Sequence, residues 1–207
     1  MKKSVNLDMT EGKPLKLILS FSVPILFGNL FQQFYNVMDT AIVGKVLGDQ
    51  ALAAVGATTP FFGLVSGMAV GATNGFSMIL SRYFGAKDEE GMKKVLFMIY
   101  ALTVLLSVVL TFGAVACIEP LLRFLNTPEL IMEDAIRYLQ VAFGGLVVMM
   151  LYNMFAGILR AVGNSVMPLV FLIISSIMNV ILDVLFVKGL GMGVAGAAWA
   201  TVLIHIT

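Results

Sequence analysis

The stretch 17–43, LILSFSVPILFGNLFQQFYNVMDTAIV, decides the fold. Its first part, residues 17–38, contains no charged side chain, and about 20 such residues are enough to cross a bilayer as an α-helix. Asp39 follows directly, so the helix carries a carboxylate at its far end. The stretch therefore predicts a transmembrane helix over residues 17–43 that holds an acid in or near the membrane.

The composition of the whole chain agrees with a lipid environment. Of its 207 residues, 59% are hydrophobic and only 12% are charged, and the mean hydropathy is +0.98. A soluble domain lacks the polar residues to cover so much apolar surface, whereas a membrane protein has the bilayer as its partner. The net charge of +1 gives no basic field, so nucleic acid is not an expected partner.

Five further apolar runs follow the first. They predict helices over residues 51–81, 94–118, 129–160, 166–187 and 193–207. The chain is therefore expected to be an all-α, polytopic membrane protein, with a polar cytoplasmic segment 1–16 and a six-helix transmembrane lobe 17–207. The last run stops at Thr207 without a polar tail, so we expect a sixth helix that is barely complete and a chain that is truncated.

The basic residues of the loops predict the orientation of the chain. With the N-terminus inside, nine of the thirteen Lys and Arg residues fall in cytoplasmic segments and four in outer segments. Because Lys and Arg are retained on the cytoplasmic side, the sequence predicts a cytoplasmic N-terminus.

Two acids, Asp39 and Asp183, fall inside the parts of these helices expected to cross the membrane; the fourth helix carries Glu129, Glu133 and Asp134 in its first part, which should lie outside the membrane before residue 138. A charged residue at bilayer depth costs about 2.5–3.5 kcal/mol on insertion scales, and such residues usually mark an ion or substrate path. The alternative is that each acid lies near a helix end and reaches the interface; Asp39 is the more open to it, since Gly44 and Lys45 follow soon after. We favour the functional interpretation for both.

Polar neighbours support that interpretation. Residues spaced by three, four and seven positions share one face of the first helix: Gln32, Tyr35, Asn36 and Asp39. Asn179 and Asp183 form an i,i+4 pair on the fifth helix. Carboxylate and amide oxygens suit a small hard cation such as Na⁺. Paired carboxyl groups away from water suit a shared proton equally well, so Na⁺ and H⁺ both remain open.

The second predicted helix carries Gly63, Gly67, Gly71 and Gly75, each four residues apart. This spacing places a smooth ridge on one helix face. In membranes such small-residue ridges allow two helices to approach closely, so we expect the ridge to pack against another helix.

At this point several segments resemble one family, the multidrug and toxic compound extrusion (MATE) transporters. The resemblance lies in residues 24–44, in the segment 51–56 (ALAAVG), in Leu159-Arg160-Ala-Val-Gly163 with Pro168, in the pair Asn179 and Asp183, and in the segment 193–201 (GVAGAAWAT). It implies one lobe of a twelve-helix, two-lobe transporter that exchanges H⁺ or Na⁺ for organic, often cationic, compounds. It implies a transporter rather than an enzyme, without a cofactor, in a prokaryotic-type cytoplasmic membrane.

The resemblance also implies the site. The ion-coupling positions, which are also the possible Na⁺ ligands, would be Asp39, Asn179, Asp183 and Thr201. Tyr138 and Asn153 would line the same cavity, together with the polar face of the first helix. The family's cargo path runs between two lobes, so this chain would need the missing C-terminal lobe or a second copy of itself as a partner.

Three alternatives stay open. A lipid-linked oligosaccharide flippase has a related fold, but its cavity should hold basic residues for phosphates, and the membrane runs contain no Lys or Arg. A membrane-embedded enzyme would gather His, Asp and Arg side chains on one face, whereas this chain has one His and two separated acids. A membrane scaffold would gain nothing from the two intramembrane acids.

Overall fold

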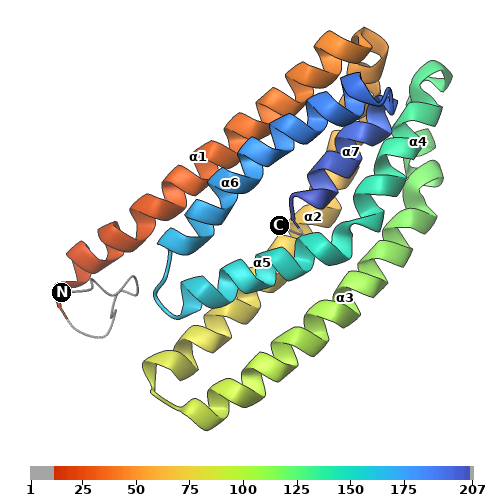
Figure 1. The fold of residues 1–207 in the computed structure, drawn as a ribbon. Coiled ribbons are helices and arrows are strands. Elements are labelled where there is room, and N and C mark those ends of the chain that lie inside the picture. The colour runs from red at the N-terminus through yellow and green to blue at the C-terminus, as the bar shows by residue number, and fades with distance from the viewer. Residues whose placement is uncertain (1–11, 206–207) are drawn as a thin grey trace.

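The computed structural model describes residues 12–205, and every regular element in that part of the chain is helical (Figure 1). The helices are α1 Pro14–Leu47, α2 Asp49–Gly85, α3 Glu89–Phe124, α4 Glu129–Gly144, α5 Leu146–Ala161, α6 Val166–Asp183 with the π-helical turn η1 Val184–Gly189, and α7 Gly193–Leu203. The all-α prediction is therefore confirmed. Residues 1–11 of the predicted cytoplasmic segment 1–16 lie outside the described part, and helix α1 already begins at Pro14, a favourable first residue of a helix.

Four helical segments are long and apolar enough to cross a membrane: α1, α2, α3 and the continuous segment Val166–Gly189. The predicted single helix 129–160 is instead two helices, α4 and α5, bent by 45° at their junction, and the pair counts as a fifth span. Two adjacent glycines, Gly144 and Gly145, occupy the junction, and such pairs are a common cause of sharp helix kinks.

The sixth predicted helix, 193–207, is correct in position but shorter than expected. Helix α7 has 11 residues and ends at Leu203, so this apolar helix is shorter than the roughly 20 residues needed to cross a bilayer. The last two residues of the predicted helix lie outside the described part of the chain.

The largest core cluster joins α2, α3, α4 and α5. Its centre is the side chain of Phe143, which is completely buried and meets the ring of Phe61 edge-on at a centroid distance of 4.9 Å. In lipid there is little hydrophobic drive between helices, so such close packing supplies most of the attraction. The outer faces stay apolar: on α1, Leu15, Ile18 and Leu19 are exposed, as expected of side chains that contact lipid.

The glycine ridge of α2 faces away from this core. A Cβ atom built on Gly63, Gly67, Gly71 or Gly75 would meet no atom within 4 Å among the described residues. The expectation that the ridge packs against another helix is therefore wrong for this part of the chain. The buried residues of α2, such as Thr58 and Thr73, lie on the opposite side of the helix.

Close approach occurs at two other glycines. A Cβ atom on Gly157 of α5 would collide with the side chain of Ser77 on α2, and one on Gly145 would collide with Val202 on α7. These two positions let α5 lie against α2 and let α7 pack onto the α4–α5 bend.

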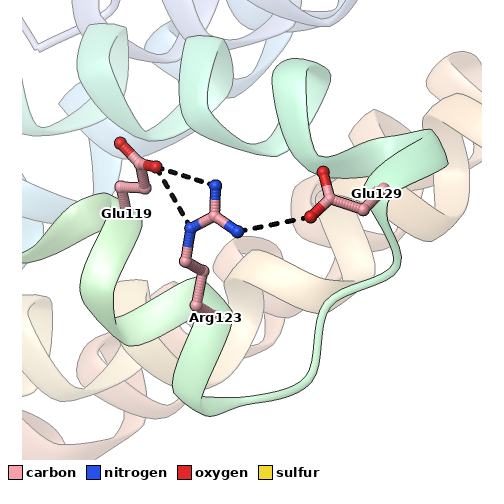
Figure 2. Close-up of polar contacts among 3 residues, drawn as sticks. All are labelled: Glu119, Arg123 and Glu129. Carbon is pink, nitrogen blue, oxygen red and sulfur yellow. Dashed lines mark hydrogen bonds and ion pairs between the residues drawn. The ribbon is translucent and has the colours of Figure 1, made fainter.

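The link between α3 and α4 is held by one arginine (Figure 2). Arg123, near the end of α3, pairs with Glu119 one turn earlier at 3.0 Å and with Glu129, the first residue of α4, at 3.3 Å. All three side chains are exposed, so this ion-pair network spans the connection at the surface of the bundle.

Helices α1 and α6 pack side by side and run in the same direction (Figure 1). Gly28 lies at this contact, where a Cβ atom on it would be 3.6 Å from a methyl group of Leu172, an ordinary packing distance. Asp39 and Asp183 follow these two residues at the same separation along their helices. Because each helical residue advances by about 1.5 Å, the two acids reach the same level of the bundle.

Candidate functional site

The carboxyl groups of Asp39 and Asp183 meet at the contact between α1 and α6. The Asp183 side chain is completely buried, whereas Asp39 is partly buried. The two groups are close enough to interact with each other, although neither oxygen of Asp183 has a hydrogen-bond partner among the described residues. Asp183 is the last α-helical residue before η1, and π-helical turns occur frequently at functional sites.

Asn179 lies one turn before Asp183 and is also completely buried. Both of its amide atoms, both oxygens of Asp183 and Oδ1 of Asp39 are buried without a hydrogen-bond partner in the described part of the chain. An unsatisfied buried polar group costs about 1–3 kcal/mol, more if it is charged. A shared proton or a small cation would relieve this cost, so the donor set fits either ion.

Asp39 lines a cavity of about 270 Å³. Seven of the nine sequence-predicted site residues line it: Gln32, Tyr35, Asn36, Asp39, Tyr138, Asn153 and Thr201. The other two, Asn179 and Asp183, are not among the lining residues and are buried beside it. The structure therefore brings together polar groups from α1, α4, α5, α6 and α7 at one place.

Two tyrosines connect the cavity wall with the acids. Tyr35 of α1 is 8% exposed and interacts with Gln32, Asp39 and Asp183. Tyr138 of α4 lies close enough to Asp39 and Tyr35 to interact with both. The phenol groups thus place potential hydrogen-bond donors beside the carboxylates.

Two more polar side chains keep an oxygen available for a cation. The hydroxyl group of Thr201 donates to the carbonyl of Ala197 at 3.1 Å, which leaves its oxygen lone pairs unused by that bond. The amide nitrogen of Asn153 donates to the carbonyl of Met149 at 2.9 Å, which leaves the amide oxygen as the acceptor end.

Sequence reasoning missed four polar residues of this cavity: Ser66, Tyr152, Ser175 and His205. His205 lies 2.7 Å from the carbonyl of Thr201 through Nδ1, and its ring meets Tyr152 edge-on at 5.1 Å. A helical projection could have found His205, because it follows Thr201 by four residues on the same face. The serines carry no comparable sequence signal, since serine is common in helices of any orientation.

Within residues 12–205, no three His, Cys, Asp or Glu side chains come close enough to form a metal site. The ligands at hand are two carboxylates with neutral oxygens around them. Such a set is suited to a monovalent hard cation or a proton more than to a transition metal, which prefers imidazole or thiolate ligands.

This arrangement defines a membrane-embedded helical lobe with a buried acid pair beside a polar cavity. A protein-family model described as MatE matches residues 24–185, and the chain belongs to this family of transporters.

Curated relatives support the assignment. The chain is 36% identical to a probable multidrug resistance protein, YpnP, of Bacillus subtilis over 198 residues, which are 95% of this chain and 44% of that protein. It is 31% identical to a protein of Shewanella oneidensis named FAD transporter, over 90% of this chain and 42% of that one. The chain therefore spans less than half the length of these relatives.

Solved structures share the fold. A crystal structure of MATE in the bent conformation matches with a TM-score of 0.89 and 33% identity, covering 100% of this chain and 45% of that one. A Pyrococcus furiosus transporter of the MOP superfamily, described as having a binding pocket of reverse polarity that suggests a different function, matches with a TM-score of 0.90 and 32% identity, covering 100% of this chain and 45% of that one. The helices described here thus correspond to about half of a MATE-type transporter.

Proposed function

We propose that this chain forms the N-terminal, ion-coupling half of an antiporter that exports organic, cationic compounds in exchange for H⁺ or Na⁺. The observation that carries the proposal is the group of Asp39, Asn179 and Asp183 beside the 270 Å³ cavity, whose buried polar atoms have no hydrogen-bond partner within residues 12–205. Membership in the MATE family supports the transport role. The proposal involves no chemical step on the cargo and no cofactor.

The coupling follows from competition for one site. A proton or Na⁺ bound at Asp39 and Asp183 would cancel negative charge at the cavity wall. A cationic compound in the same cavity would be attracted by that charge. Because coupling between two ligands is reciprocal, binding of the ion weakens binding of the cation and the reverse, as exchange requires.

The charge of the cavity favours this cargo over the anionic cargo of a flippase. No Lys or Arg lines the cavity at Asp39 in the described part of the chain. A lipid-linked oligosaccharide carries phosphates, which would need such residues. The names of the relatives include multidrug resistance proteins and a FAD transporter, so the cargo class is the part of the proposal that most needs a direct assay.

The orientation belongs to the same proposal. The excess of Lys and Arg in the segments before α1 and between α2 and α3 supports a cytoplasmic N-terminus and a prokaryotic-type cytoplasmic membrane. In that orientation Asp39 and Asp183 lie towards the outer side, because both α1 and α6 run from the N-terminal end towards the opposite end (Figure 1).

Export from proteoliposomes tests the proposal. The 207-residue chain alone is compared with the same chain joined to the second half of the Bacillus relative, under imposed H⁺ and Na⁺ gradients and with a fluorescent organic cation as cargo. We expect gradient-driven export at least from the joined protein, with loss of export in Asp39→Asn and Asp183→Asn. Undiminished export in both variants would refute the coupling role.

A further inference from the structure

Arg160, near the end of α5, is the one arginine in the described part of the chain that is partly buried without an acidic partner. Its Nη2 atom donates to Oδ1 of Asn74 on α2 at 3.4 Å, and no acid within residues 12–205 forms an ion pair with it. Arg123 and Arg137, by contrast, are exposed and paired with glutamates. A guanidinium group is always charged. A charge removed from water is normally paired with an opposite charge, so we expect an anion beside Arg160.

The cavities on both sides of Arg160 lack that anion. The larger one, of about 500 Å³, is lined by Arg160 with Phe21, Asn74, Ser77, Ser81 and Phe84 among others, and no carboxylate is among its lining residues. The smaller one, of about 90 Å³, also has no carboxylate among its described lining residues, and it includes Ser165, whose buried hydroxyl has no hydrogen-bond partner in the same part of the chain.

Among the described residues, neither serine of the larger cavity is hydrogen-bonded to the guanidinium group, whose bond goes to Asn74. Ser77 donates to the carbonyl of Thr73 and Ser81 to that of Met78, each at 2.8 Å. A guanidinium group has five N–H donors in a fork that matches two oxygens of a phosphate. Since one donor is occupied by Asn74, Arg160 has enough donors left for such a pair of bonds.

The larger cavity lies where lipid headgroups would be. Helix α2 ends at Gly85 and α5 ends at Ala161, and both residues line it. The exposed turn 86–88 and the first two residues of α3, Glu89 and Glu90, follow α2 immediately, and their charges mark this end as the water side. The cavity wall also holds Phe21 and Met78, which are suited to contact with glycerol and the first carbons of an acyl chain.

We propose that Arg160 binds the phosphate of an anionic phospholipid, with the headgroup in the cavity between α1, α2 and α5. A lipid is favoured over a soluble phosphate compound because the site combines one cationic fork with an apolar wall at a lipid-exposed helix face. The proposal does not depend on the transport role, since it concerns occupancy of a site outside the cavity at Asp39.

The test measures lipid binding by the intact, purified protein in a neutral detergent. Native mass spectrometry and thermal melting are recorded with phosphatidylglycerol, phosphatidylcholine and inorganic phosphate. We expect phosphatidylglycerol to bind most tightly and to raise the melting temperature. Arg160→Gln should weaken that binding about tenfold or more, because the charged hydrogen bonds are lost. Arg160→Lys should be intermediate, since an ammonium group keeps the charge without the fork.

Two further variants make the result specific. Arg82→Gln removes an exposed charge at the same end of α2 that does not line the cavity, and it should leave binding unchanged. Ser81→Phe should fill the cavity and weaken binding while Arg160 stays in place, which guards against an Arg160 variant that fails to fold. Equal binding by Arg160→Gln and the wild type, or an equal loss in Arg82→Gln, would overturn the proposal. Inorganic phosphate that binds as tightly as the lipid would overturn the lipid assignment.

Discussion

Asp39 and Asp183 interact across the contact between α1 and α6, although they lie far apart in the sequence. The contact exists because these two helices pack side by side and run in the same direction (Figure 1). A single pair of helices thus brings both intramembrane acids to the same level of the bundle.

Neutralising either acid should abolish ion-driven export. Asp39→Asn and Asp183→Asn keep the size of the side chain but remove the charge that binds an ion. We expect resistance of cells to toxic cations to fall to the level of cells without the transporter, with unchanged amounts of protein in the membrane. Asp134→Asn on α4 makes the same chemical change outside the cavity and should keep full resistance. A loss in the control as large as in the two site variants would contradict the assignment.

Thr201→Val should separate the two candidate ions. Its hydroxyl oxygen is a possible ligand of Na⁺ but is not needed by a proton shared between carboxylates. We expect Na⁺-driven export to need about tenfold more Na⁺, while H⁺-driven export stays unchanged, as measured in proteoliposomes under each gradient. Thr201→Ser retains the oxygen and serves as the control. Equal losses under both gradients would show that Thr201 has a structural role only.

Gly145→Ala should destabilise the fold, whereas Gly144→Ala should not. A Cβ atom at Gly145 would collide with Val202, while one at Gly144 would meet no atom within 4 Å. We expect Gly145→Ala to cost about 1–3 kcal/mol through overpacking. Thermal melting of the purified protein checks this, and Val202→Ala combined with Gly145→Ala should recover part of the loss. Equal melting temperatures for both single variants would contradict this packing.

Gly67→Ala should make this chain slightly more stable. Its Cβ atom would have free space, and alanine favours a helix over glycine by about 0.5–1 kcal/mol. A small rise in melting temperature is expected for the 207-residue chain. If the same change lowers the stability of the chain joined to a second half, the ridge is covered by that half. A loss of stability in the 207-residue chain itself would show that the ridge packs within it.

Arg123→Gln should change stability very little, even though Figure 2 shows three charged groups in contact. The side chains of Glu119, Arg123 and Glu129 are all more than half exposed, and exposed ion pairs contribute little because water and salt screen them. We expect Arg123→Gln and the unaltered chain to have nearly equal melting temperatures, both at low salt and at high salt. A large drop confined to low salt would mean that the α3–α4 link depends on this network.

The sequence allowed the all-helical class to be predicted, and it named seven of the residues that line the candidate cavity. Long uncharged runs predict helices in lipid, and helical spacing placed Asn179 beside Asp183 correctly. The bend at Gly145 was missed because apolar residues flank the glycine pair on both sides, so no change in composition marks a break in the helix. The prediction that the glycine ridge around Gly67 packs against another helix was wrong for the described residues, because the spacing defines a helix face but not what that face contacts. The spacing of four residues from Thr201 could have placed His205 on the same helix face, whereas its contact with the Tyr152 ring depends on how α7 packs against α5.

The position of the acid pair on helices of one lobe links ion binding to the stability of that lobe. Asp39, Asn179, Asp183 and Thr201 all come from this chain, so an ion held by them binds the folded form and not the unfolded form. Such a ligand raises the free energy of unfolding by RT ln(1 + [L]/Kd). Melting curves recorded over a series of Na⁺ concentrations therefore become a titration of the site, which reports ion affinity without any measurement of transport.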